Sequence, residues 1–153
     1  MYFKTVHFPS NLNHTQVEAA LRKASMKETI SLDFTSKSIN IGTDKIFWGL
    51  ERKRNLKFTR IRTSFEFFLP KLIINLSKNP SVNFYKIRPG ALSIVVAGLL
   101  FFGVFTGILG VIKGRPNIES LILFPVLIVI YIALTLFELR LTASRAVKVL
   151  NQI

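Results

Sequence analysis

Two long stretches without a charged residue constrain this chain more than any other feature of its sequence. Residues 91–112 give 22 consecutive uncharged positions, and residues 120–137 give another 18, extended at the edges by Ile118 and Leu139. At a rise of about 1.5 Å per residue, a helix over either stretch is about as long as the hydrocarbon core of a bilayer is thick. The sequence therefore predicts two membrane-spanning helices, over residues 91–112 and 118–139.

The linker between the two stretches predicts how they are arranged. Residues 113–117 are short, polar and rich in residues that break helices, so the two spans are expected to form an antiparallel hairpin. Positive residues flanking the hairpin on the side of the termini outnumber those of the linker by five to two, which predicts that both termini are cytoplasmic. In a bacterium, this is a two-span, multi-pass protein of the cytoplasmic (inner) membrane. The five flanking residues are Lys86, Arg88, Arg140, Arg145 and Lys148.

Charge is distributed unevenly along the chain. Its net charge is +13, although half of its residues are hydrophobic, and residues 1–90 hold 16 of the 21 Lys and Arg. The absence of cysteine excludes a disulfide scaffold, a thiolate metal site and a cysteine nucleophile. The predicted domains are a basic cytosolic β-rich module (1–90), a transmembrane hairpin (91–139) and a basic amphipathic tail (140–153).

Residues 1–90 have the pattern of a small α+β unit in which strands predominate. Asn13, with Gln16 three positions later, predicts the start of a single helix. About six strands separated by turn residues predict a sequential meander in a curled sheet or small barrel. The predicted fold class is an α+β membrane protein: this module, an antiparallel two-helix transmembrane hairpin and a short C-terminal cytosolic helix. The candidate strands are 2–8, 29–34, 38–41, 45–50, 56–63, 69–76 and 82–87.

Two patterns near the hairpin are candidate packing surfaces. Gly103, Gly107 and Gly110 form a stripe of small residues, which predicts close helix packing either within the hairpin or between subunits of a homo-oligomer. Apolar residues of the tail recur at heptad-like spacing, and this seam can dock on the module or on neighbouring copies. The seam consists of Leu139, Ala143, Ala146, Leu150 and Ile153.

The sequence contains few patterns typical of catalytic or metal-binding sites, so we predict that the chain is not an enzyme and holds no cofactor or metal. His7 and His14 have no carboxylate spaced to complete a metal site, and Glu51 and Glu66 stand alone in the sequence. Glycine-rich phosphate loops and nucleophile elbows are absent. Glu138, at the end of the second span, predicts either an interfacial charge pair, with Arg88 in reach, or a pore-mouth carboxylate.

The segment from Glu51 to Arg62 is the candidate binding site. If residues 56–63 form a strand, Arg60 and Arg62 share the inward face with Leu56 and Phe58, and buried guanidinium groups need an anionic partner. Phosphates of a single-stranded oligonucleotide or nucleotide suit such a cluster, and Trp48 and Phe58 are candidates for stacking on bases. The six cationic candidates are Arg52, Lys53, Arg54, Lys57, Arg60 and Arg62.

Other interpretations of this basic cluster remain open. It can be a solvated hairpin tip, a further positive-inside determinant, a surface for anionic membrane lipids, or a site for an acidic protein partner.

The whole-chain plan resembles the membrane effectors of bacterial antiphage defence systems. Some of those pair two spans with a small β-barrel that senses cyclic oligonucleotides, although there the helices come first. The membrane effector of the Hailong system, an oligomeric channel restrained by DNA oligomers, is the nearer functional analogue. Residues 65–71 and 137–139 also resemble a group of uncharacterised two-span bacterial membrane proteins.

The resemblance and the basic cluster together predict an antiviral defence protein. We expect an oligomeric ion channel or membrane-disrupting effector, controlled by a nucleotide or DNA-type ligand bound to the module. The alternative is a non-conducting accessory or scaffold subunit whose basic module binds anionic lipid or a protein partner.

Overall fold

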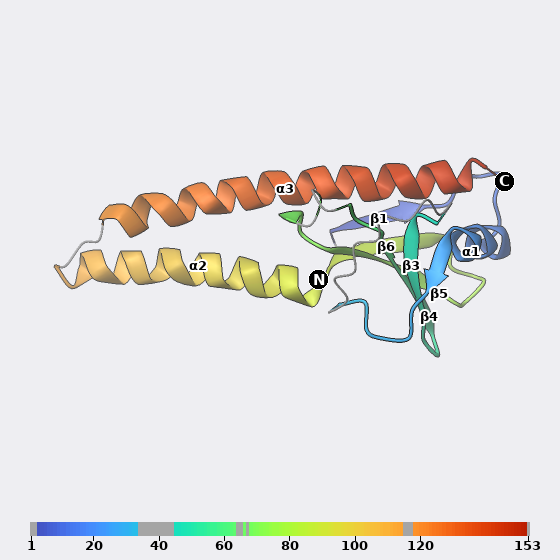
Figure 1. Ribbon diagram of the computed structural model, residues 1–153, viewed down its shortest axis with the longest axis horizontal. Helices are drawn as coiled ribbons and strands as arrows, with labels where there is room; N and C mark the ends of the chain where they lie inside the picture. The colour runs from blue at the N-terminus through green and yellow to red at the C-terminus, as the bar shows by residue number, and fades with distance from the viewer. Residues whose placement is uncertain (1–2, 34–44, 64–65, 67, 115–117, 153) are drawn as a thin grey trace.

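A six-stranded sheet is followed by two long helices in the computed structural model, which describes residues 3–33, 45–63, 66, 68–114 and 118–152 (Figure 1). The predicted α+β class, with two helices long and apolar enough to cross a membrane, is confirmed. The elements are β1 (Lys4–His7), α1 (His14–Lys23), β2 (Ser25–Lys27), β3 (Phe47–Glu51), β4 (Asn55–Arg60), β5 (Leu72–Ser77), β6 (Phe84–Pro89), α2 (Ala91–Ile112) and α3 (Ile118–Leu150).

The strand order in the sheet is β1-β6-β5-β4-β3-β2. Strands β3 to β6 pair antiparallel in sequence order, so the predicted meander is confirmed for these four. β1 pairs antiparallel with β6 at one edge, and β2 pairs parallel with β3 at the other. A parallel pair forms there because the chain leaves α1 beside β3, where the backbone N–H of Ile46 donates to the carbonyl of Ala24.

Two of the predicted strands have different outcomes. The strand predicted at 29–34 is wrong over its described part, residues 29–33, because the chain has already paired with β3 through β2 and turns away after Glu28. The strand predicted at 38–41 lies outside the described residues.

The helix α1 begins as its sequence predicts. The side chain of Asn13 accepts a hydrogen bond from the backbone N–H of Gln16, and the Gln16 side chain accepts one from the backbone N–H of Asn13. This capping box satisfies N–H groups that a helix start leaves without partners. The buried face of α1, with Val17 and Leu21, packs into the main core of the module.

The C-terminal half of α3 completes that core. Ala146, Val149 and Leu150 are almost fully buried in the same cluster as α1 and the sheet residues, and Leu139 and Ala143 pack against it. Four members of the predicted seam, Leu139, Ala143, Ala146 and Leu150, therefore dock on the module of their own chain, and Ile153 lies outside the described residues. No break separates the second apolar stretch from the tail, because α3 is one helix of 33 residues.

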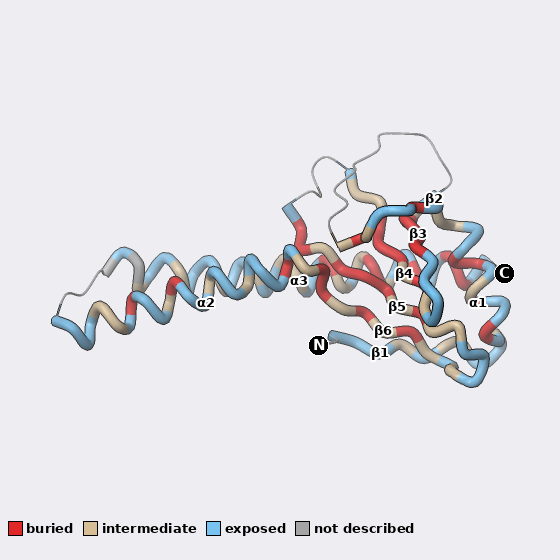
Figure 2. Tube along the Cα trace, turned by 90° about the horizontal axis from the view of Figure 1, so that it is seen from below, coloured by how far each residue is buried: buried red, intermediate tan, exposed pale blue. Residues whose placement is uncertain are grey.

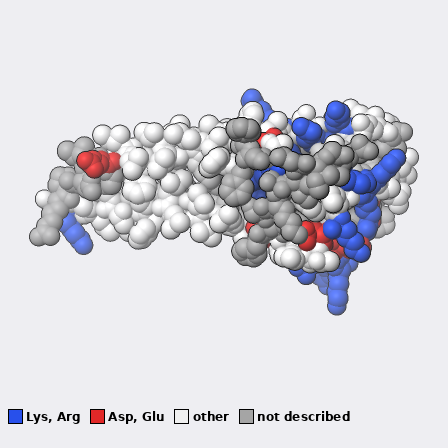
Figure 3. All heavy atoms as spheres, in the orientation of Figure 1, with Lys and Arg blue, Asp and Glu red and all other residues white. Residues whose placement is uncertain are grey.

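The two long helices project away from the module as a hairpin (Figures 1 and 2). α2 has the bounds predicted for the first span, and Leu121–Leu150 of α3 includes most of the second apolar stretch. Most side chains of the two apolar stretches are exposed. Charged atoms visible in Figure 3 gather on the module and at the hairpin turn, whereas the surface between them is uncharged.

Candidate functional site

The six predicted basic residues divide into an exposed group and a buried group along one β-hairpin. Arg52, Lys53 and Arg54 lie in the turn between β3 and β4, which we call the basic turn, and all three are exposed. Within the described part of the chain, their side chains form no hydrogen bond or ion pair. Lys and Arg side chains project at the tip of this hairpin in Figure 3. The basic turn therefore presents three cations to solvent.

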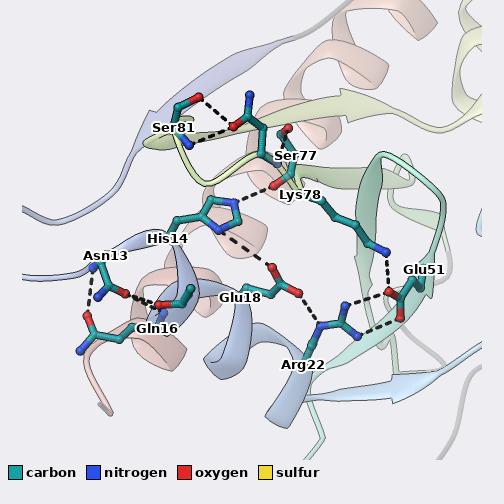
Figure 4. Close-up of polar contacts among 11 residues, drawn as sticks. Asn13, His14, Gln16, Glu18, Arg22, Glu51, Ser77, Lys78 and Ser81 are labelled. Carbon is teal, nitrogen blue, oxygen red and sulfur yellow. Dashed lines mark hydrogen bonds and ion pairs between the residues drawn. The ribbon is translucent and has the colours of Figure 1, made fainter.

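Glu51, at the end of β3, does not neutralise the basic turn, because other cations bind it. The two terminal nitrogens of Arg22 lie 2.9 and 3.0 Å from its carboxylate oxygens, and Lys78 donates to the same carboxylate (Figure 4). These hydrogen bonds, first from Arg22 and then from Lys78, lower the pKa of Glu51 to about 2. At neutral pH, Glu51 is thus an ionised carboxylate that is already paired.

Arg60, at the other end of β4, is buried and bridges two carboxylates. One terminal nitrogen lies 2.7 Å from Oε2 of Glu138 in α3, and the other lies 2.7 Å from Oε2 of Glu66. Arg60 is 4% exposed and Glu138 is 1% exposed. The expectation that an inward arginine needs an anionic partner is correct, but the partner belongs to the same chain. Arg60 is therefore not available to a phosphate ligand, which corrects that assignment.

Arg60 and Glu66 keep their charges because their hydrogen bonds and ion pairs outweigh desolvation. Burial pulls the pKa of Arg60 down, but the hydrogen bonds and charges of Glu138 and Glu66 raise it above its ordinary value. Burial likewise pushes the pKa of Glu66 up, and the backbone N–H of Thr63 together with Arg60 brings it below its ordinary value. We call Arg60, Arg62, Glu66 and Glu138 the ion cluster.

Arg62 is the less well satisfied member of the ion cluster. Its side chain is 15% exposed, and its Nη2 lies 3.8 Å from Oε1 of Glu138. Its Nε and Nη2 form no hydrogen bond with the described residues. Burial lowers the pKa of Arg62, and the charge of Glu138 offsets only part of this effect. Glu138 therefore serves two arginines, and Thr142 also donates to it at 3.3 Å. Arg62 therefore faces this internal carboxylate, and its assignment to a ligand phosphate stays a prediction.

The predicted stacking residues lie in the interior. Phe58 is 1% exposed in the main core, and Trp48 is 6% exposed in a smaller cluster with Leu32, Leu50 and Ile73. Neither ring offers a face to a ligand in this fold, which corrects the stacking assignment. Lys57, on the opposite face of β4 from Phe58, is half-buried. Recognition at the basic turn would therefore depend on ionic contacts alone.

Besides the ion cluster, a set of hydrogen bonds around Asp33 connects the module to the start of α2. Asp33 accepts hydrogen bonds at 3.0 Å from both terminal nitrogens of Arg88, and its Oδ1 also accepts the backbone N–H of Ala91 at 3.1 Å. A carboxylate at this position caps the first turn of α2. Arg88 therefore pairs with Asp33, whereas the sequence had suggested Glu138 as a partner within its reach.

The glycine stripe packs at least partly inside the hairpin. A Cβ placed on Gly103 would come within 2.3–2.6 Å of the ring of Phe124 in α3, so any larger residue there requires that ring to move. Gly107 is buried and Gly110 is half-buried. The intramolecular alternative thus accounts for Gly103.

The partner of Arg60 is the functional contact that sequence reasoning missed. Glu138 and Arg60 are 78 positions apart. The sequence predicted for Glu138 either an interfacial charge pair, with Arg88 in reach, or a pore-mouth carboxylate. Two features of the sequence could have predicted this pair: an acid at the end of an apolar stretch, and arginines on the inward face of a strand. Glu66, which stands alone in the sequence, is brought to Arg60 by the chain after β4.

Comparisons with known proteins give no relative for this chain, because no family model, no curated protein and no solved structure matches it at a significant level. Within the described residues, no group of three or more His, Asp or Glu side chains lies close enough to hold a metal ion.

Proposed function

We propose that this protein is the membrane-anchored subunit of an oligomeric channel or membrane-disrupting effector, controlled by a phosphate-bearing polyanion such as a single-stranded oligonucleotide. One observation carries the proposal: β4 begins at the exposed basic turn and ends at Arg60, which binds Glu138 of α3. A ligand at the turn is therefore separated from the hairpin helix by a single strand in the middle of the sheet.

The basic turn has the properties of a phosphate site. Its three cations are adjacent and form no ion pair among the described residues, and Glu51 beside them is paired with Arg22 and Lys78. Ion contacts to phosphates are strong and independent of sequence. The β3–β4 hairpin also points sideways from the long axis of α2 and α3 (Figure 1), which favours a soluble polyanion over lipid headgroups.

The ion cluster is the route by which binding would reach the helices. A ligand shifts a conformational equilibrium only by its difference in affinity between the two states. Movement of β4 on binding would strain the bridge between Arg60 and Glu138, because a buried ion pair tolerates little change in geometry. Two helices cannot enclose a pore, so a conducting state requires several copies of the chain.

Ligand binding can be tested with the full-length protein in liposomes and a fluorescent single-stranded oligonucleotide. The logarithm of affinity should fall with the logarithm of salt concentration at a slope of about −2 for three phosphate contacts. Replacing Arg52, Lys53 or Arg54 by alanine should reduce the slope by about 0.7 each. Lys113→Ala, an exposed cation at the hairpin turn, is the matched control and should leave the slope unchanged.

Release of a trapped dye from the same liposomes tests the effector part of the proposal. Oligonucleotide should change the rate of release, and the change should disappear in the triple alanine variant of the basic turn. If oligonucleotide binds without altering release under any condition, the controlled-effector proposal is refuted.

A second candidate is a non-conducting accessory or scaffold subunit, and the polar residues of the hairpin favour it. Thr106 donates to the carbonyl of Gly103 at 2.8 Å, and Thr135 donates to that of Tyr131 at 2.7 Å. Tyr131 in turn donates to the carbonyl of Ser93 at 2.6 Å. These hydroxyls are satisfied within the hairpin, as an anchor requires, and do not form a polar stripe. A monomer in detergent that never permeabilises liposomes would establish this candidate.

A further inference from the structure

An apolar cavity of about 420 Å³ lies where the two long helices meet the module. α2 contributes Ile94, Ala97 and Phe101 to its wall, and α3 contributes Ile132 and Leu136. Cavities that hold small organic ligands have volumes of about 300–1,000 Å³ and are lined mostly by apolar side chains. Size and lining therefore fit a hydrocarbon ligand.

The hydroxyl groups in the wall are already used. Tyr131 donates to the carbonyl of Ser93, and the Ser93 hydroxyl donates to the carbonyl of Lys71 at 3.1 Å. Thr135 donates to the carbonyl of Tyr131. A polar ligand would thus lose its own hydrogen bonds to water without replacement, which costs free energy, whereas an alkyl chain loses nothing. The cavity selects for hydrocarbon.

The cavity is continuous with the apolar outer surface of the hairpin. Ile94 is 52% exposed, Phe101 is 62% exposed and Leu136 is 55% exposed, although all three line the cavity. If α2 and α3 cross a bilayer, this opening faces lipid tails. The source of a hydrocarbon chain is then the membrane itself.

A cation of α3 lies on the same side of the helix as two residues of the cavity wall, Ile132 and Leu136. Arg140 follows Leu136 by four positions in α3, which places it one helical turn further on the same side. It is exposed, and its side chain forms no hydrogen bond or ion pair with any residue that the structure describes. A guanidinium group at this position complements the phosphate of a lipid whose tail enters the cavity.

We propose that this cavity binds the acyl chain of a membrane phospholipid, with the lipid phosphate bound by Arg140. The site rests on the membrane location in the proposed function but not on the basic turn. Phe3, Pro70 and Pro89 of the module also line the cavity, so a bound chain would contact the module and both helices together. The lipid would thereby stabilise the arrangement of the module on the hairpin.

The test uses the full-length protein in nanodiscs that contain phosphatidylglycerol with a photoreactive diazirine in its acyl chain. Labelled positions are mapped by mass spectrometry. Ala97→Trp and Leu136→Trp each fill the cavity from a different helix and should lower labelling of the cavity wall by about tenfold, equivalent to about 1.4 kcal/mol of binding free energy. Val95→Trp is the matched control, because Val95 is 56% exposed on α2 and does not line the cavity.

A second pair of variants tests the phosphate contact. Arg140→Gln should lower labelling by about twofold to fivefold, the contribution of one exposed ion contact. Arg145→Gln, at an exposed arginine further along α3, should leave labelling unchanged. Equal effects of the two variants would refute the role of Arg140.

Two results would overturn the site in distinguishable ways. Even labelling around both helices, unaffected by either tryptophan in the cavity, would mean that only bulk lipid surrounds the hairpin and would refute the site alone. If α2 and α3 are not labelled at all, the membrane location fails as well.

Discussion

Removing the charge of Glu138 is the sharpest test of how the module is held on α3. Glu138→Gln keeps the shape of the side chain but replaces the carboxylate that binds Arg60 and lies 3.8 Å from Arg62. Both guanidinium groups stay buried, and Arg62 loses the only carboxylate within ion-pair distance among the described residues. The variant therefore leaves Arg62 without a carboxylate and Arg60 with Glu66 alone.

The size of the effect follows from the partners that remain. Breaking a buried ion pair by removing one partner costs about 3–5 kcal/mol. Because Glu66 still binds Arg60 at 2.7 Å, we expect the lower end of that range, about 3 kcal/mol of unfolding free energy. For a unit of the size of the module, about 4–8 °C per kcal/mol gives a decrease in the melting temperature of about 12–24 °C.

The assay can use the single tryptophan of the chain. Trp48 lies in β3 and is 6% exposed, so its fluorescence reports unfolding of the sheet. Thermal melts of the full-length protein in detergent would compare Glu138→Gln with Glu119→Gln, an exposed acid in the first turn of the same helix. The control should change the melting temperature by no more than a surface substitution does, within about 0.5 kcal/mol.

A double variant separates the ion pair from simple packing. Arg60→Met with Glu138→Leu replaces both charges by apolar groups, a change that is often neutral or stabilising for buried pairs. We expect it to regain the part of the lost stability that comes from leaving Arg60 without Glu138, whereas the part that comes from Arg62 remains lost. If Glu138→Gln melts like the original chain, the reasoning that Glu138 holds two buried arginines is refuted.

Three further predictions concern the hairpin, its orientation and the ion cluster. Gly103→Leu should disrupt the hairpin because its Cβ would overlap the ring of Phe124, whereas Gly98→Leu should not, because Gly98 has open space around it. The assay is disulfide cross-linking between cysteines placed in α2 and α3, and equal cross-linking of the two variants would contradict this prediction. A topology reporter at Gly114 should lie on the opposite side of the membrane from reporters at the termini, and the same side for all would refute the hairpin orientation. The pKa of Glu66 in the folded protein is below its ordinary value of 4.5. The ionised Glu66 therefore stabilises the fold above about pH 4.5, and this stabilisation is lost as the pH falls toward the folded-state pKa. Below about pH 4.5, the melting temperature of Glu66→Gln should depend less on pH than that of the original chain.

The sequence by itself determined those helix bounds and turns that depend only on residues close by in the chain. The bounds of α2 follow from an uninterrupted apolar stretch between a glycine and a lysine, and the start of α1 follows from the capping box at Asn13. The β3–β4 and β5–β6 turns follow from clusters of polar and turn-forming residues at 52–55 and 78–81. Each of these signals lies within a few residues of the structure it specifies, so no knowledge of distant contacts is needed.

Tertiary structure alone decided what the arginines bind. The sequence indicated that Arg60 and Arg62 point inward and need an anion, because strand alternation is a local property. It could not indicate which anion, since the carboxylate of Glu138 comes from a helix 78 positions away. Only the docking of α3 on the sheet, driven by burial of Ala146, Val149 and Leu150, brings that carboxylate to Arg60 and occupies Arg60 within the chain.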